Sequence, residues 1–226
     1  MSPMDLAVLA QLGDCEAIHE GWLRQPINAW SSLVFSAVGV AIVIGARSAV
    51  GRRERIDRVV FGLLLLATGV GSFFFHGSRP AAAHFLHDVT FLGSLLFLMV
   101  ANVTGAFRLD HRLTGIIAVG GLIVLGSALA VEPGITNALT VVLIVALITQ
   151  DIALRTKARP ARGWYVAALG SLGLAVALFL AGRTGSPLCD PSGPLQAHAG
   201  WHAFSAVFLG AYFLATAPAR TGGETA

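Results

Sequence analysis

The stretch GSFFFHGSRPAAAHFLHDVTFLG, residues 71–93, joins the end of one long apolar segment to the start of the next. It gathers polar side chains of a kind that is scarce in the other apolar segments, namely Ser72, His76, His84, His87 and Asp88. A second cluster, HAGWH at residues 198–202, opens the last apolar segment. Ionisable side chains inside an apolar segment are costly, so these two places are the first candidates for a functional site.

The composition indicates an integral membrane protein. Of the 226 residues, 55% are hydrophobic and 12% are charged, whereas a soluble domain carries about 25% charged residues. Seven apolar stretches are long enough to cross about 30 Å of hydrocarbon, near residues 29–46, 59–76, 84–106, 114–131, 135–153, 164–181 and 197–216. We therefore expect an all-α fold, a single seven-transmembrane helix bundle over residues 1–226, with an outer N-terminal cap at 1–28 and a cytoplasmic tail at 217–226.

The basic residues predict the orientation of this bundle in the membrane. The loops after the first, third and fifth stretches, together with the tail, hold 12 of the 15 Lys and Arg residues. The other side holds only Arg24, Arg79 and Arg183. We therefore expect the N-terminus outside and the C-terminus in the cytoplasm. This asymmetry accounts for the net charge of +3, which does not call for a nucleic-acid partner.

Two histidines four residues apart, His198 and His202, project from one helix face and offer two nitrogens to one metal. By the expected topology, Ser72, His76 and Asp88 lie at the same outer level of the bundle. Three neutral imidazoles form a zinc site that keeps one position open for water, and zinc lowers the pKa of that water toward about 7. In this interpretation Asp88 transfers the proton and Ser72 donates a hydrogen bond to the developing oxyanion.

Other uses of the same residues explain fewer of them. Haem held by two histidines would leave the third histidine and Asp88 without a role, and a Ser-His-Asp hydrolase would leave the pair at 198 and 202 unexplained. Each polar group also has a structural interpretation: Ser72 bonds the carbonyl four residues back, and Asp88 is favoured at a helix N-terminus. Asp151, near the cytoplasmic end of its stretch, is explained by an ion pair with Arg155.

Two further features fall on the expected outer side. Oxygen-bearing side chains precede or begin the first apolar stretch, and such ligands suit a hard cation such as calcium; they are Asp14, Glu16, Glu20 and Asn28. Taken alone, this cluster favours a solvated cap over a metal site. Both cysteines, Cys15 and Cys189, also lie on this side, where an oxidising compartment favours a disulfide over two free thiols.

These motifs resemble those of the alkaline ceramidases, a family within the CREST superfamily of seven-span proteins. The resemblance rests on GVGSFFFH at 69–76, on Asp88 about a dozen residues later, on CDPSGPLQAHAGWH at 189–202, and on Cys15-Glu16 followed by Trp30. It therefore covers most of the chain in the order of the family.

The resemblance implies a role for each of the residues that match. It implies zinc bound by His76, His198 and His202. It implies that Asp88 and Ser72 assist amide hydrolysis, and that the two cysteines form a disulfide. It also implies calcium near the N-terminus, where Glu16 is the residue that matches cleanly.

We therefore expect a zinc-dependent, ceramidase-like intramembrane hydrolase that releases a fatty acid from an N-acyl lipid, with its active site toward the non-cytoplasmic side of a multi-pass membrane protein. Its expected partner is the lipid substrate, ceramide or another N-acyl lipid, and no obligate protein partner is inferred. The alternative is a seven-helix lipid receptor or sensor that holds zinc structurally without turnover. A solute transporter would need charged or broken helices at mid-membrane, and the fourth to sixth stretches offer little of either.

Overall fold

The computed structural model describes residues 13–154 and 161–221, and its regular secondary structure is helical. The long helices are α2 (Pro26–Gly45), α3 (Arg52–His76), α4 (Ala81–Phe107), α5 (His111–Val131), α6 (Thr136–Leu154), α7 (Arg162–Ala181) and α8 (Ala197–Thr221). Two short 3₁₀ turns, η1 (Ala46–Ser48) and η2 (Pro133–Ile135), extend or precede them. The described residues contain no strand, only an isolated bridge between Asp14 and Arg183. The expected all-α fold is confirmed.

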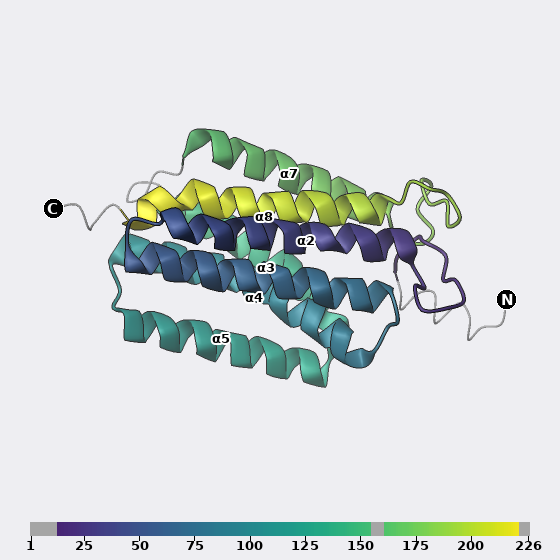
Figure 1. Ribbon diagram of the computed structural model, residues 1–226, viewed down its shortest axis with the longest axis horizontal. Helices are drawn as coiled ribbons and strands as arrows, with labels where there is room; N and C mark the ends of the chain where they lie inside the picture. Colours follow the sequence, from purple (N-terminus) through teal and green to yellow (C-terminus); the bar gives the residue numbers. More distant parts are fainter. Residues whose placement is uncertain (1–12, 155–160, 222–226) are drawn as a thin grey trace.

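The helices run side by side along the long axis of the molecule (Figure 1). Helices α2, α3 and α8 lie between α5 at one edge and α7 at the other. The end of the bundle that holds the start of α2, the end of α3 and the start of α8 is called the histidine end here. Successive helices alternate in direction, so α2 begins at the histidine end and α8 finishes at the opposite one.

Six helical segments are long and apolar enough to cross a membrane, and they comprise every long helix except α8. The first turns of α8 hold several polar residues, among them His198 and His202. A multi-pass membrane protein is therefore supported, while the seven-span count and the orientation stay predictions. The first 12 residues of the expected cap, the basic residues of 155–160 and the end of the expected tail lie outside the described residues.

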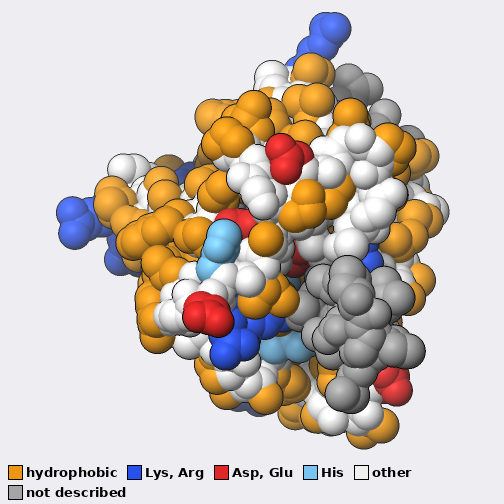
Figure 2. Space-filling model, turned by 90° about the vertical axis from the view of Figure 1, so that its right-hand side faces the viewer, with side chains coloured by type: hydrophobic (Ala, Val, Ile, Leu, Met, Phe, Trp, Pro, Cys, Tyr) orange, Lys and Arg blue, Asp and Glu red, His pale blue; other side chains and the backbone are white. Residues whose placement is uncertain are grey.

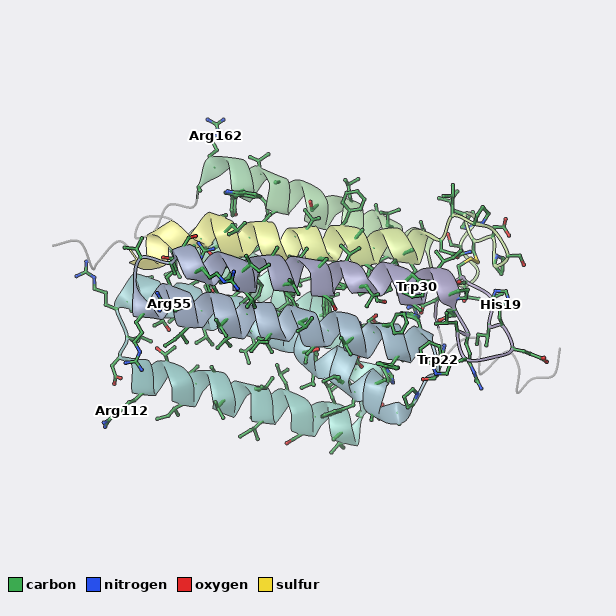
Figure 3. The ribbon with its side chains drawn as sticks, in the orientation of Figure 1. His19, Trp22, Trp30, Arg55, Arg112 and Arg162 are labelled. Atoms are coloured by element: carbon green, nitrogen blue, oxygen red, sulfur yellow. A yellow bond between two sulfur atoms is a disulfide. The ribbon has the colours of Figure 1, made fainter. Side chains whose placement is uncertain are left out.

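Helix α3 begins earlier than its apolar stretch, at Arg52 instead of 59. The charged segment after Gly51 continues the helix, because Glu54 and Arg58 form an i, i+4 ion pair at 2.7 Å. Asp151 accepts a hydrogen bond from the hydroxyl of Tyr165, and Arg155, its expected partner, lies outside the described residues. Figure 3 shows Arg55, Arg112 and Arg162 at one end of the bundle, with His19, Trp22 and Trp30 at the other.

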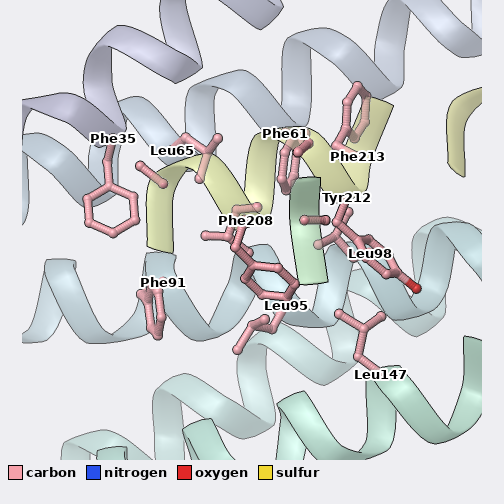
Figure 4. Packing of buried hydrophobic residues seen from close by; sticks show 14 of the residues in the cluster. Phe35, Phe61, Leu65, Phe91, Leu95, Leu98, Leu147, Phe208, Tyr212 and Phe213 are labelled. Atoms are coloured by element: carbon pink, nitrogen blue, oxygen red, sulfur yellow. The ribbon is translucent and has the colours of Figure 1, made fainter. Parts of the chain in front are cut away.

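The core lies between α2, α3, α4 and α8, where aromatic and leucine side chains interlock (Figure 4). Phe61 of α3 stacks on Phe213 of α8 with ring centroids 4.6 Å apart. Helices α5, α6 and α7 instead expose many apolar side chains, such as Ile116, Val141 and Val166. That is the distribution expected of helices that face lipid on one side and a packed centre on the other.

The segment before α2 and the loop before α8 form a cap over the histidine end. The Cys15–Cys189 disulfide is present and closes a separation of 174 residues, as expected. Backbone hydrogen bonds at 2.8 Å from Cys15 N to Gly182 O and from Ala17 N to Pro191 O continue the same contact. The cap therefore holds its side chains in fixed positions above the ends of α3 and α8.

Candidate metal centre

Three histidine side chains meet at the histidine end of the bundle. His76 is the last residue of α3, and His198 and His202 lie one turn apart at the start of α8. One ligand nitrogen from each lies within 4.8 Å of the other two. The three residues are 1%, 6% and 0% exposed. Within the described part of the chain, they form the one group of three or more His, Cys, Asp or Glu residues that meets this spacing.

A different side chain lies next to the Nδ1 atom of each of these imidazoles. His76 Nδ1 lies 2.8 Å from Gln25 Oε1, and His202 Nδ1 lies 2.8 Å from Ser31 Oγ. His198 Nδ1 lies 3.1 Å from Asp14 Oδ1, which is an ion-pair distance without the geometry of a hydrogen bond. Metal-binding histidines commonly donate one ring N–H to such a partner, which fixes the ring and leaves the other nitrogen for the metal.

The donor set fits a zinc ion. His202 Nε2 is buried and has no hydrogen-bond partner among the residues the structure describes, and a buried polar atom of that kind calls for a ligand. Three neutral imidazoles suit zinc and other borderline first-row metals better than calcium or magnesium, which prefer oxygen. Three protein ligands also leave an open position, as in catalytic zinc sites.

Asp14 is a partner of this centre that the sequence did not indicate. In addition to its contact with His198, its Oδ2 lies 3.8 Å from His76 Nδ1. Burial raises the pKa of Asp14 to about 7, and the positive charges of Arg183 and Arg79 partly oppose this shift. Asp14 was expected as an oxygen ligand of calcium, and the structure instead places it against two histidines.

The other residues expected at a calcium site are Glu16, Glu20 and Asn28. The Glu16 carboxylate accepts backbone hydrogen bonds from Ile27 and Asn28, each at 2.8 Å, and so caps the start of α2. Burial raises the pKa of Glu16, and these two hydrogen bonds oppose the shift. Glu20 is exposed. Asn28 is fully buried, and its side-chain amide has no partner in the described ranges. Calcium at these residues stays a prediction.

Ser72 is buried on the same face of α3 as His76, one turn earlier. Its Oγ lies 2.8 Å from Ser32 Oγ of α2, and Ser32 Oγ is in turn 3.5 Å from His202 Nδ1. Ser72 is therefore linked to the metal centre through the hydroxyl of Ser32. Ser31 and Ser32 follow Asn28 by three and four residues. This polar face at the start of an apolar helix was the feature of the sequence that could have indicated their contact with the site.

Asp88 lies in a second cluster, which is built on α4. Its Oδ1 is 2.8 Å from His87 Nδ1, and its Oδ2 is 3.2 Å from His84 Nε2. The hydroxyl of Thr136, the first residue of α6, donates to the same Oδ2 at 2.6 Å. The two histidines that the sequence singled out without a role therefore both bind Asp88.

Aromatic rings connect the two clusters. The ring of Phe75 stacks on His84 at 4.5 Å and on His87 at 5.9 Å, and it contacts His76 at 4.9 Å. Figure 2 shows the histidine end of the molecule from outside, where acidic, basic and histidine side chains gather among hydrophobic ones. The two clusters thus belong to one polar region at the end of an apolar bundle.

A comparison of the chain with protein-family models and with curated proteins finds no match. Membership of the alkaline ceramidases is therefore a proposal, and the function follows from the chemistry of the site.

Proposed function

We propose that this protein is a zinc-dependent intramembrane hydrolase, similar to the alkaline ceramidases, that cleaves the amide bond of an N-acyl lipid. The observation that carries the proposal is the convergence of three buried imidazoles at the polar end of an apolar helix bundle. Two of them are hydrogen-bonded at Nδ1, and the third has a carboxylate beside its Nδ1 atom. A structural role for the metal would not require the second polar cluster around Asp88.

Zinc at the three histidines supplies Lewis acidity and lowers the pKa of a coordinated water toward about 7. The residues around it supply the remaining functions. The Asp88 cluster provides nitrogens and oxygens that exchange protons, and the Ser32–Ser72 pair provides hydroxyl donors near His202. Together these groups can supply a nucleophile, a proton carrier and a donor to the oxyanion, which are the functions that assist hydrolysis of an unactivated amide.

The depth of the site supports a lipid substrate. The amide of an N-acyl lipid lies between its head group and its hydrocarbon chain, hence at the level where apolar helices meet a polar cap. Trp22 and Trp30 are exposed at this same end, as expected of aromatic side chains at a membrane interface. Apolar side chains exposed along α4 and α5, such as Phe85 and Ile116, provide a surface for the acyl chain.

We further propose that all seven helices span the membrane and that the histidine end faces the non-cytoplasmic side. The disulfide lies at the histidine end, and disulfides persist in oxidising compartments. The arginines labelled in Figure 3 lie at the other end, where the positive-inside rule predicts the cytoplasm.

The test is to measure zinc content and fatty-acid release together. Purified wild-type protein is compared with His202→Ala, and His19→Ala serves as the matched control because His19 is exposed and outside the centre. We expect one zinc per chain and release of fatty acid from a fluorescent ceramide in wild type and control, and neither in His202→Ala.

Two other outcomes would contradict the proposal. Zinc that is lost in His202→Ala, with no release by the wild type from a panel of lipid amides and esters, would favour the receptor alternative. A wild type that purifies without zinc and takes none up on addition of the metal would contradict the metal centre itself.

A further inference from the structure

We infer that His87, oriented by Asp88, is the general base and general acid of this site, and that Asp88 acts on the reaction through His87. This inference rests on the proposed function, and it assigns the proton transfer to a residue that neither the motifs nor the resemblance indicated.

The first support is the state of the His87 ring. Its Nδ1 lies 2.8 Å from Asp88 Oδ1, so the carboxylate favours the proton on that nitrogen. Its Nε2 is buried and meets no hydrogen-bond partner within residues 13–154 and 161–221. An imidazole with Nδ1–H held by a carboxylate carries a lone pair on Nε2, which is the arrangement of a histidine general base. A buried nitrogen without a partner is costly unless a ligand meets it.

The second support is the environment of Asp88. Three donors occupy its carboxylate, from His87, His84 and Thr136, and an ionised carboxylate has about four lone-pair positions. Asp88 is itself buried. Protonation of this carboxylate would weaken the hydrogen bonds that fix its position, because these donors bind a charged acceptor more strongly than a neutral one. These contacts are therefore more typical of a carboxylate that orients a histidine than of a carboxylate that exchanges the proton directly.

The third support is the position of His87 beside the metal centre. Its ring stacks on Phe75, the neighbour of His76, at 5.9 Å and on Phe91 at 6.2 Å. The Phe91 ring lies 5.7 Å from Trp201, which contacts both His198 and His202.

The packing of α3 against α4 fixes this position. A Cβ atom at Gly71 would lie 2.7 Å from the backbone nitrogen of His87. Glycine therefore lets α4 approach α3 at the level of Ser72, one turn before His76. A larger residue at position 71 would push His87 away from the centre.

The proton balance of the reaction follows. His87 Nε2 accepts a proton from the attacking water as the water oxygen forms its bond to the carbonyl carbon of the lipid. When the carbon–nitrogen bond breaks, His87 returns that proton from Nε2 to the nitrogen of the leaving amine. The products are a fatty acid and an amine, and His87 regains its starting state.

The turnover test compares His87→Gln with the wild type at equal zinc occupancy. We expect the rate to fall by about 10²–10⁴-fold, the range for loss of a general acid–base group, with zinc content unchanged. His19→Gln, the same change at an exposed histidine, is expected to keep the wild-type rate. In His87→Ala, added imidazole is expected to restore part of the rate, which would not occur if His87 only packed.

A second readout does not depend on activity or metal. In zinc-free protein labelled with ¹⁵N at histidine, the resonances that disappear in His87→Gln belong to His87. We expect them to show a protonated Nδ1 and an unprotonated Nε2. We expect Asp88→Asn to change these resonances. An Nε2–H tautomer in the wild type would overturn the inference, as would a His87→Gln rate equal to the wild-type rate. A wild type with no turnover on any amide would overturn the proposed function and this role together, whereas activity that survives His87→Gln overturns this role alone.

Discussion

The histidine end holds two clusters of histidines that differ in how each imidazole is held. In the candidate metal centre, Gln25 and Ser31 each form a hydrogen bond with one Nδ1 atom, and Asp14 lies beside the third, so each ring has a neighbour of its own. In the α4 cluster, His84 and His87 share one carboxylate, that of Asp88. The partner of each imidazole therefore decides its chemistry: separate partners favour a metal site, and a shared carboxylate favours proton transfer.

The largest expected effect is the loss of bound zinc, which we expect from a change in one cluster and not from a change in the other. His76→Ala removes one of three ligands, so we expect loss of bound zinc and of all measurable turnover. His84→Ala removes a histidine from the neighbouring cluster, and we expect zinc to stay at one per chain. Metal analysis of the two purified variants is the measurement. Zinc loss in both would mean that the clusters are not independent.

The next effect concerns the carboxylate that His84 and His87 share. We expect Asp88→Asn to keep zinc and to lower the turnover number by about 10²–10⁴-fold, because asparagine does not hold His87 in the tautomer with a free Nε2. The rate with a fluorescent ceramide, measured at saturating zinc, checks this. A turnover number within a few-fold of the wild type would show that the carboxylate has no part in the reaction.

Helix geometry explains which of these contacts the sequence could predict. His198 and His202, and likewise His84 and Asp88, stand four residues apart, so each pair shares a helix face. His87 and Asp88 are adjacent, and adjacent residues do not face each other on a regular helix. Their hydrogen bond depends on the side-chain rotamers, which the packing of Phe75 and Phe91 on the His87 ring sets.

Contacts between distant segments were the other part that the sequence could not indicate. Asp14 precedes the first helix and His198 begins the last, and nothing in their local sequence pairs them. The disulfide at Cys15 places Asp14 over α8. The cysteine pair was expected from the sequence, but the contact between Asp14 and His198 that follows from it was not. Gln25 was likewise missed, since a single amide before Pro26 is ordinary at the start of a helix.

A smaller effect tests how the metal centre is supported. Asp14→Asn removes the carboxyl group beside His198, and loss of such a partner typically lowers metal affinity by about 10–100-fold. We expect the zinc dissociation constant, measured by competition with a chelator, to rise by that factor, and turnover to recover at excess zinc. Glu132→Gln is the matched control, because Glu132 is an exposed acid that contacts the Gly134 backbone. Equal affinities in both variants would contradict a supporting role for Asp14.

The smallest effect tests the far side of the α4 cluster. Thr136 donates a 2.6 Å hydrogen bond to Asp88 Oδ2, and valine has nearly the same shape without the hydroxyl. Loss of one hydrogen bond that only orients the carboxylate corresponds to about 1 kcal/mol, or roughly a five-fold lower turnover number, with zinc unchanged. Thr140→Val serves as the control, because the Thr140 hydroxyl donates to the carbonyl of Thr136 within α6 and not to Asp88.

A lower turnover number in Thr136→Val that Thr140→Val does not share would show that α6 helps to fix Asp88. Equal rates in both variants would mean that His84 and the rest of α4 position the carboxylate without help from α6.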